Sequence, residues 1–141
     1  MPANECIPIY EDADRVTVHA SAALTGKRFA KITGRQAGYR AATGTLANLD
    51  TTGAGGNYTA DVPAAGTDKC YGVVSHDVAL GDKVTLLRRM ILPVTAGATV
   101  VVGTEVEVDA QGRVITLASG KAVGFVLYGN TVGLDAEIYV Y

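Results

Sequence analysis

KCYGVVSHDVALGDKVTLL, at residues 69–87, returns 52 residues later in a related form as KAVGFVLYGNTVGLDAEIY, at residues 121–139. The two stretches carry lysine, glycine or an apolar residue at seven matched positions, without gaps. The pairs are Lys69 with Lys121, Gly72 with Gly124, Val74 with Val126, Leu80 with Val132, Gly81 with Gly133, Val84 with Ala136 and Leu86 with Ile138. Short apolar runs bounded by glycine are typical of buried strands. Each stretch therefore predicts a strand, a turn and a second strand.

The second half of this unit is found more widely, as a glycine, two turn residues and then apolar residues at alternate positions. The segments with this pattern are 26–32, 81–86, 103–108 and 133–138. Glycine permits the positive φ of a tight turn, and alternation points successive side chains to opposite faces of a sheet. The pattern predicts an all-β, antiparallel-rich barrel or sandwich with two related strand-turn-strand units. A solenoid is disfavoured because it usually needs three or more stacked units.

The same alternation indicates where the strands lie. We expect them at residues 15–20, 27–33, 70–75, 83–87, 90–94, 99–102, 105–109, 113–118, 122–127 and 136–141. In the last strand Ala136, Ile138 and Val140 are predicted to face inward. Residues 109–112 have the composition of a hairpin turn.

The chain of 141 residues is predicted to be a single domain preceded by an arm. Residues 1–14 contain two prolines, four acids and no periodicity, which predicts an extended arm that becomes ordered only against a partner. Residues 15–141 are predicted to form the β-rich domain, with a loop rich in glycine, alanine and threonine at residues 34–68. Because the chain has no Trp and only two Phe, its core consists of small side chains, and oligomerisation would help to stabilise it.

Charge is unevenly placed although the formal net charge is only −2. Acids open the chain, and a basic segment then precedes the next acid, Asp50; its members are Arg15, Lys27, Arg28, Lys31, Arg35 and Arg40. Nucleic-acid-binding domains are usually basic overall, with aromatics among the bases, so we interpret the segment as a solvated or protein-facing surface. No apolar stretch reaches 18 residues, and residues 1–11 lack the features of a secretion signal. We expect no nucleic acid and no membrane as partners, and no export by a standard signal.

Groups that could perform chemistry are few. Ser75-His76-Asp77 has the residue types of a nucleophilic triad, but neighbouring residues in a strand point to opposite faces, so a turn with capping polar groups is predicted. No other arrangement of nucleophile and base is evident in the sequence. We therefore expect no catalytic residues and no enzymatic activity.

Metal and cofactor sites are also not predicted. Glu105, Glu107 and Asp109 share one face of a strand, but no loop supplies the further oxygens that calcium needs, so we interpret them as solvated carboxylates. Cys6 and Cys70 have neither metal-ligand spacing nor the density of a disulfide framework, and are predicted to be reduced thiols, with Cys70 packed in a strand. We expect no metal and no cofactor.

Several stretches carry a resemblance to a known family over nearly the whole chain. They are Asn4-Glu5-Cys6-Ile7-Pro8, Val16-Thr17-Val18-His19-Ala20 with Thr25-Gly26-Lys27-Arg28-Phe29, Gly133-Leu134-Asp135-Ala136-Glu137-Ile138, and the run from Gly112-Arg113-Val114 through Val123-Gly124-Phe125-Val126. In them the chain resembles the small capsid decoration, or cement, proteins of tailed bacteriophages, especially those of actinobacterial hosts. The last run is similar to a broader group of phage head proteins.

The resemblance implies a β-rich structural protein, made in the bacterial host cytoplasm, that assembles as a homotrimer on the exterior of the capsid. It implies that the major capsid protein is the partner and that the trimer cements neighbouring capsomers at three-fold or quasi-three-fold positions. An alternative is a virion-surface carbohydrate-binding module for host attachment, although the tyrosines of the sequence are dispersed.

The N-terminal arm supplies the candidate contacts with the capsid. Its apolar side chains lie in an extended segment that could add to a neighbouring sheet edge. The predicted contact residues are Glu5, Ile7, Pro8, Ile9 and Tyr10. Two other interpretations remain open: the arm packs on its own subunit, or it makes no contact.

Overall fold

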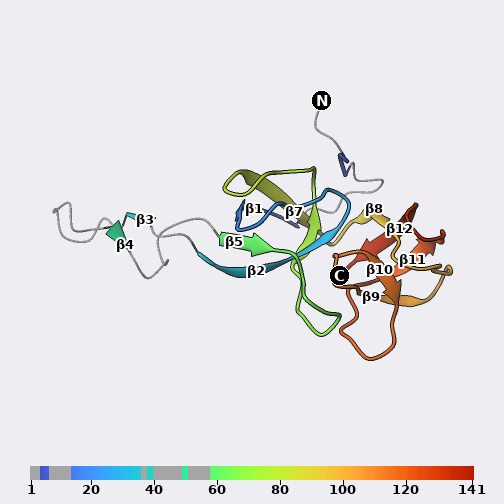
Figure 1. The fold of residues 1–141 in the computed structure, drawn as a ribbon. Helices are drawn as coiled ribbons and strands as arrows, with labels where there is room; N and C mark the ends of the chain where they lie inside the picture. Colours follow the sequence, from blue (N-terminus) through green and yellow to red (C-terminus); the bar gives the residue numbers. More distant parts are fainter. Residues whose placement is uncertain (1–3, 7–13, 36–37, 40–48, 51–57) are drawn as a thin grey trace.

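Alternating apolar residues build the strands, most plainly in β12 (Asp135–Val140), where every second side chain is buried. The structure is a computed structural model that describes residues 4–6, 14–35, 38–39, 49–50 and 58–141. These residues form β-strands and no helix (Figure 1). The predicted all-β single domain is confirmed. Ala136, Ile138 and Val140 are buried, as predicted.

The first part of the domain, which we call the first lobe, is a closed five-stranded barrel. Around the barrel the strands are β1 (Asp14–Ala20), β5 (Tyr58–Asp61), β2 (Phe29–Arg35), β6 (Gly72–Val74) and β7 (Lys83–Arg88). All neighbours are antiparallel except β1 and β5, which are parallel. The small side chains of Val18, Ala30 and Ala60 line its interior together with Leu86.

The second lobe is a five-stranded antiparallel sheet whose outer strands approach each other. Its order is β10 (Val114–Thr116), β9 (Glu105–Val108), β11 (Gly124–Tyr128), β12 and β8 (Ile91–Thr95). An isolated parallel bridge joins Ala96, just after β8, to Val114 of β10. Two further short strands, β3 (Gly38–Tyr39) and β4 (Leu49–Asp50), pair with each other.

The two lobes are copies of one fold, because the same backbone contacts occur in both. Three contacts illustrate the correspondence. Val74 pairs with Leu86 as Val126 pairs with Ile138, Leu24 bridges Val78 as Val100 bridges Asn130, and Ser21 donates to the Ala60 carbonyl as Gly97 donates to that of Val114. The predicted strand-turn-strand unit is therefore the second half of a larger duplicated element. Each copy forms its own lobe, rather than half of one barrel.

Matched glycines hold the same close approach in each copy. A Cβ on Gly72 would collide with the carbonyl oxygen of Leu87, and a Cβ on Gly124 would collide with that of Tyr139. In addition, the turn residues Gly81 and Gly133 both have a φ near the left-handed region, 87° and 83°. The glycine spacing seen in the sequence is therefore a consequence of strand contact and turn geometry.

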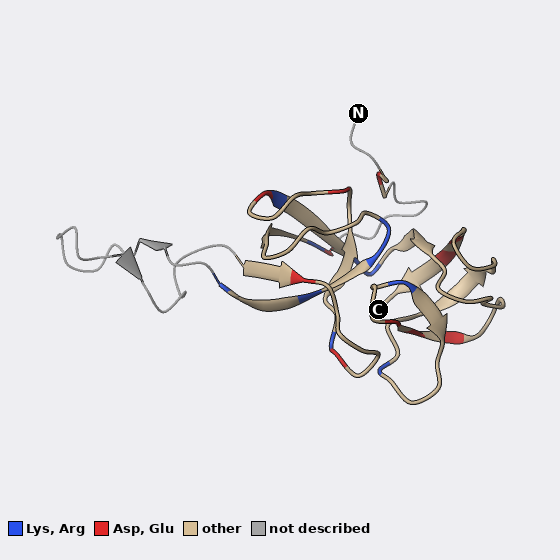
Figure 2. Cartoon of the chain, viewed as in Figure 1, with Lys and Arg blue, Asp and Glu red and all other residues tan. Residues whose placement is uncertain are grey.

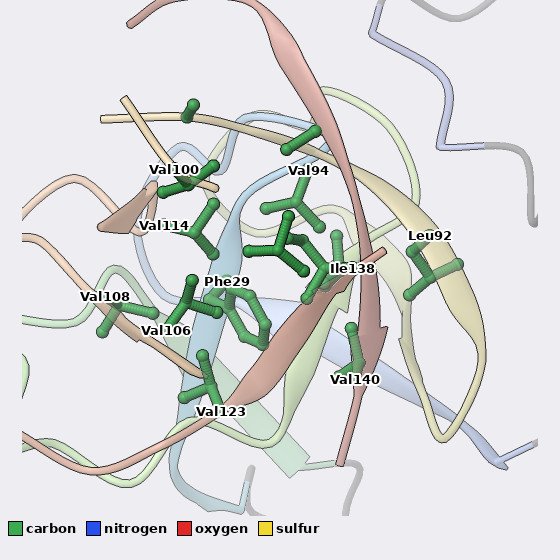
Figure 3. Packing of buried hydrophobic residues seen from close by; sticks show 14 of the residues in the cluster. Phe29, Leu92, Val94, Val100, Val106, Val108, Val114, Val123, Ile138 and Val140 are labelled. Carbon is green, nitrogen blue, oxygen red and sulfur yellow. The ribbon is translucent and has the colours of Figure 1, made fainter. Parts of the chain in front are cut away.

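The hydrophobic core of the second lobe extends into the first. Phe29, Val73 and Leu87 belong to first-lobe strands, yet they are buried in one cluster with residues of β8 to β12. Figure 3 shows the Phe29 ring surrounded by valines of the second lobe, with Val106 and Val123 nearby. The aromatic side chain occupies space that small residues alone would leave empty.

Polar contacts fix the same junction. The Phe29 N–H donates to the Gly112 carbonyl at 2.8 Å, and the Thr95 N–H donates to the Lys27 carbonyl at 2.9 Å. Lys27 also pairs with Asp135 at 2.7 Å. The backbone at Gly112 has a φ of 77°, and a Cβ there would collide with the Phe29 carbonyl oxygen. The hairpin turn predicted at residues 109–112 is thus also a contact between the lobes.

Three of the expected strand and loop positions differ in the structure. Residues 99–102 do not form a strand, and only Val100 makes an isolated bridge. The segment 34–68, predicted to be a loop, contains β5, which completes the first barrel. Cys70 lies just before β6 instead of within a strand, although it packs against the core.

We predict that Phe29→Ala lowers the free energy of unfolding by about 3–5 kcal/mol, as large aromatic truncations in cores do. Because the ring is carried by a strand of the first lobe and is buried in the core of the second, its loss affects the unfolding of both lobes. Urea denaturation followed by circular dichroism measures the change.

The matched control is Leu80→Ala, whose side chain is 69% exposed and whose loss has little effect. If Phe29→Ala unfolded at the same urea concentration as the unmodified chain, the two lobes would not depend on this ring.

Candidate interaction surfaces

The described part of the N-terminal arm, Asn4 to Cys6, packs on its own chain. The Cys6 N–H donates to the Ser75 carbonyl at 2.6 Å, and the Cys6 thiol contacts the Pro93 carbonyl oxygen at 3.5 Å. Cys6 is 4% exposed, and burial raises the pKa of its thiol to about 12. The thiol is therefore a packed apolar group that bridges the two lobes.

Asn4 is also bound to the domain, by hydrogen bonds to the Asp77 carboxylate. The Asn4 amide donates to both carboxylate oxygens of Asp77, at 3.1 and 2.9 Å, and the Gly26 N–H donates to the same carboxylate at 2.8 Å. Asn4 itself has a φ of 51°. Its carbonyl oxygen lies where a Cβ on residue 26 would stand, so the chain can cross there only over a glycine.

This packing corrects the prediction for part of the arm. Residues 4–6 are ordered against their own domain, because Cys6 has an apolar pocket to fill and Asn4 has a carboxylate to cap. Of the predicted capsid-contact residues, Glu5 is exposed beside them. Ile7, Pro8, Ile9 and Tyr10 lie outside the described residues.

The basic segment is largely engaged in contacts within the chain. Lys27 pairs with Asp135, and Lys31 pairs with Asp68 at 2.9 Å. The Arg35 guanidinium lies 4.7 Å from the centre of the Tyr58 ring. The interpretation as a solvated surface is therefore incomplete: several of these cations hold strands and loops together. Arg40 lies outside the described residues.

The three carboxylates at alternate positions from Glu105 to Asp109, in β9 and just after it, do not form a common site. Glu107 is buried, and its Oε2 accepts hydrogen bonds from the backbone of Ala118, Ser119 and Gly120. Asp109 caps the hairpin and pairs with Arg113 at 2.8 Å, whereas Glu105 accepts from the Tyr141 hydroxyl. Within the described residues no group of His, Cys, Asp and Glu could hold a metal ion.

The prediction of solvated carboxylates is thus wrong for Glu107. It faces outward from the strand, as alternation requires, but the loop at residues 118–120 folds over it and offers three N–H donors. These backbone hydrogen bonds lower the pKa of Glu107 below its usual value. The carboxylate stabilises a loop in the way that a capping residue stabilises a helix end.

Ser75, His76 and Asp77 form the predicted polar turn. Ser75 Oγ lies 3.0 Å from Nδ1 of His76. Asp77 instead holds Asn4 and Gly26, as described above. The three side chains therefore serve local contacts, with the acid directed to the N-terminal segment.

One end of the second lobe exposes a group of large apolar side chains, which we call the apolar end. It consists of Val101, Val102, Leu127, Tyr128, Val132 and Leu134. Backbone hydrogen bonds hold its loops side by side, from the Gly103 N–H to the Val126 carbonyl and from the Val100 N–H to the Asn130 carbonyl. Contiguous exposed apolar groups of this kind mark protein contact sites.

The first lobe provides an internal comparison for the apolar end. At the matched positions of the first lobe, Thr25 and Gly26 stand for the two valines, and Ser75 and His76 stand for Leu127 and Tyr128. The backbone contacts are equivalent, so the fold itself does not require apolar residues there. Asn4 packs on Gly26 in the first lobe. The matched residue of the second lobe, Val102, is 62% exposed.

Aromatic side chains gather on the outer face of β11 and β12. Ring centres of Phe125 and Tyr139 lie 5.5 Å apart, and those of Tyr139 and Tyr141 lie 6.4 Å apart. The expectation of dispersed tyrosines is therefore wrong for these two, because neighbouring strands align their outward positions. The rings are tilted by 34° to 63° and form no common plane.

The fold defines the chain as a β-protein with a duplicated five-stranded unit, which is a closed barrel in the first lobe and a sheet in the second. The structure is similar to the crystal structure of the base of a phage head fibre, "head fiber gp8.5 N base in bacteriophage phi29". The TM-score is 0.65 at 14% sequence identity, over 91% of this chain and 93% of that one. No protein-family model matches the sequence, and no curated protein matches it. No helix in the described part of the chain is long and apolar enough to cross a membrane.

We predict that Glu107→Gln lowers the melting temperature at neutral pH and flattens its dependence on acid. The folded pKa of Glu107 is depressed below its usual value of 4.5. Its contribution is therefore fully present above the unfolded pKa and is lost as pH falls through the folded pKa. Melting curves from pH 7 to pH 3 measure both effects.

Glu137→Gln, on the outer face of β12, is the matched control because it makes the same change of charge. The interpretation is refuted if the unmodified chain and Glu107→Gln lose stability in parallel below pH 4.5.

Proposed function

We propose that this chain is a structural protein of a phage virion that binds the exterior of the assembled capsid. The observation that carries the proposal is its likeness to the phi29 head fibre base over nearly the full length of both chains. The sequence resemblance to phage decoration proteins supports the same role independently. The carboxylates of Asp77, Glu107 and Asp109 make structural contacts, which fits a role without chemistry.

The shell-facing surface in this proposal combines the N-terminal arm with the apolar end. A chain of contacts links the two: Asn4 lies on Gly26, and the next residue, Lys27, is bonded to Asp135, which follows Leu134 in the chain. Five of the six positions of the apolar end have small or polar counterparts in the first lobe, and Leu80, the counterpart of Val132, is the exception. The fold therefore does not require most of these large side chains. We assign Glu5, Ile7, Pro8, Ile9 and Tyr10 as arm contacts, with the major capsid protein as the partner.

Cementing follows from binding that exists only on the intact lattice. A protein that binds assembled capsomers and not free ones stabilises the assembly by mass action. In the proposal three copies act as one trimer, so that several weak contacts add up to a firm attachment. The small side chains of the core favour such an oligomer.

We predict that the variant Ile7→Ser/Ile9→Ser/Tyr10→Ser occupies stripped particles at least tenfold less well than the unmodified chain. The substitutions remove apolar side chains of the arm and leave Asn4 and Cys6 unchanged, and circular dichroism of the variant checks that the fold is retained. Particles are stripped of the native protein and incubated with each chain, and occupancy and DNA release on heating are then measured.

Val16→Ser/Ile32→Ser is unsuitable as a control because both residues pack against the first core. Leu80→Ser is suitable, since it is an exposed apolar residue of the first lobe and its loss should leave occupancy unchanged. Equal occupancy and protection by the arm variant would refute the arm assignment. Failure of the unmodified chain to rebind or protect would refute the cementing role.

The trimer is tested separately. We predict a native mass of three times the 14.5 kDa of one chain, measured by native mass spectrometry of the purified protein and by the copy number on intact particles. We also predict that Tyr128→Asp/Val132→Asp leaves the purified trimer intact while abolishing particle binding, because the apolar end is assigned to the shell. Dissociation of the purified trimer by these substitutions would reassign the apolar end to subunit contact.

A second candidate function is a carbohydrate-binding module for host attachment. The cluster of Phe125, Tyr139 and Tyr141 favours it, since sugars stack on aromatic faces. The tilt between the rings makes the cluster less suited to a flat sugar chain. A glycan array probed with the unmodified chain and with Tyr139→Ala distinguishes the two functions: binding that depends on Tyr139 supports the module.

A further inference from the structure

A cleft of about 370 Å³ lies between the lobes, on the side where the chain reaches Tyr141. Its lining is largely apolar: Phe29, Val123 and Val140 are buried residues and form the base, and Tyr71 and Tyr141 also line the cleft. Its rim is basic, formed by Lys69, Lys121 and Arg88. Figure 2 shows basic residues on the loops that run between the two lobes.

The geometry keeps the three cations around one space. The Lys121 N–H donates to the Gly66 carbonyl at 2.8 Å, which ties the second-lobe loop to the first-lobe loop that carries Lys69. Arg88 donates from Nε to the main-chain oxygen of Tyr141 at 3.2 Å, and its guanidinium lies 5.0 Å from the centre of the Tyr71 ring. The two lysines occupy matched positions of the duplicated unit, so the repeat brings equivalent charges to a shared cleft.

The two lysines of this rim are in no ion pair within the described part of the chain. The ion pairs there are Lys27 with Asp135, Lys31 with Asp68, Arg89 with Asp14 and Arg113 with Asp109. Asp68 precedes Lys69 but is bound to Lys31, and Glu105 accepts from the Tyr141 hydroxyl. Neither Lys69 nor Lys121 is paired with a described carboxylate.

We propose that this cleft binds an acidic peptide segment of a protein partner, with glutamate or aspartate carboxylates at the lysines and the aliphatic parts against the aromatic walls. Charge complementarity selects the carboxylates. The apolar base suits side chains with a hydrocarbon stem better than a free phosphate, which is usually held by clustered backbone N–H groups. Nucleic acid is disfavoured because the chain carries a net charge of −2.

The inference deepens the proposed function, on which it rests for the identity of the partner as a virion protein. The cleft lies on the lobe junction and has its own charges and walls, separate from the apolar end. It would add a charged, salt-sensitive contact to an attachment that is otherwise apolar.

The test uses the full chain and a fluorescein-labelled hexaglutamate peptide as the probe, with fluorescence polarisation at low and at physiological salt. We expect binding that weakens as salt rises, no binding of a hexaglutamine peptide, and at least a tenfold loss of affinity in Lys69→Ala/Lys121→Ala. The matched control is Lys83→Ala/Arg89→Ala, which also removes two positive charges, both from exposed residues that do not line the cleft. Its affinity should stay within twofold of the unmodified chain.

Three outcomes overturn the proposal: no binding of hexaglutamate, equal binding by Lys69→Ala/Lys121→Ala, or displacement of the peptide by an equal concentration of inorganic phosphate. Circular dichroism and melting curves of each variant confirm that the fold is intact; both lysine side chains are exposed, so their removal should not affect it. Rebinding of the unmodified chain to stripped particles is measured in parallel. If the unmodified chain rebinds particles but not the peptide, only the proposal for the cleft is refuted. If it binds the peptide but not particles, the proposed virion role is refuted.

Discussion

The insertion of Phe29 into the second lobe is the contact on which the rest of the structure depends. In the second lobe β10 is short, and only one isolated bridge connects it to the chain just after β8. Its core is made mainly of valine and alanine, which cannot fill a large space between sheets. A single aromatic ring from the neighbouring copy supplies that volume, and the Gly112 and Lys27 backbone contacts hold it there. Two lobes that each have a thin core thereby become one cooperative domain.

Duplication has left the backbone alike and made the surfaces different. The first copy covers one end with Asn4 to Cys6 and carries small or polar residues such as Gly26 and Ser75 there. The second copy leaves the matched end open and apolar. Lys69 and Lys121, in contrast, are the same in both copies and line one cleft at the junction. The ends of the two lobes differ, which indicates separate roles for them. The two lysines are shared, which indicates that they act together.

The sequence predicted the strand-turn-strand repeat well because its glycines have a local cause, namely turns with positive φ and backbones in close contact. It did not predict the full duplication, since the connection between β2 and β6 is much longer than its counterpart and shifts the alignment. In addition, Phe29 of the first copy corresponds to Glu105 of the second, and this difference in residue type makes the duplication harder to recognise from the sequence. For the interaction surfaces, alternation placed Glu107 on the outer face correctly, but no local pattern indicates that a distant loop will cover it.

The pairing of β2 with β5 has a practical meaning for variation of the chain. Arg35 and Tyr58 are register partners, so the chain leaves the barrel and re-enters it at points about 5 Å apart. The entropy cost of closing a loop between such points grows only slowly with its length. The barrel can therefore accept sequences of very different size at this place without any change in its own strands. The position between β2 and β5 is therefore suited to insertions, including a foreign epitope attached by protein engineering.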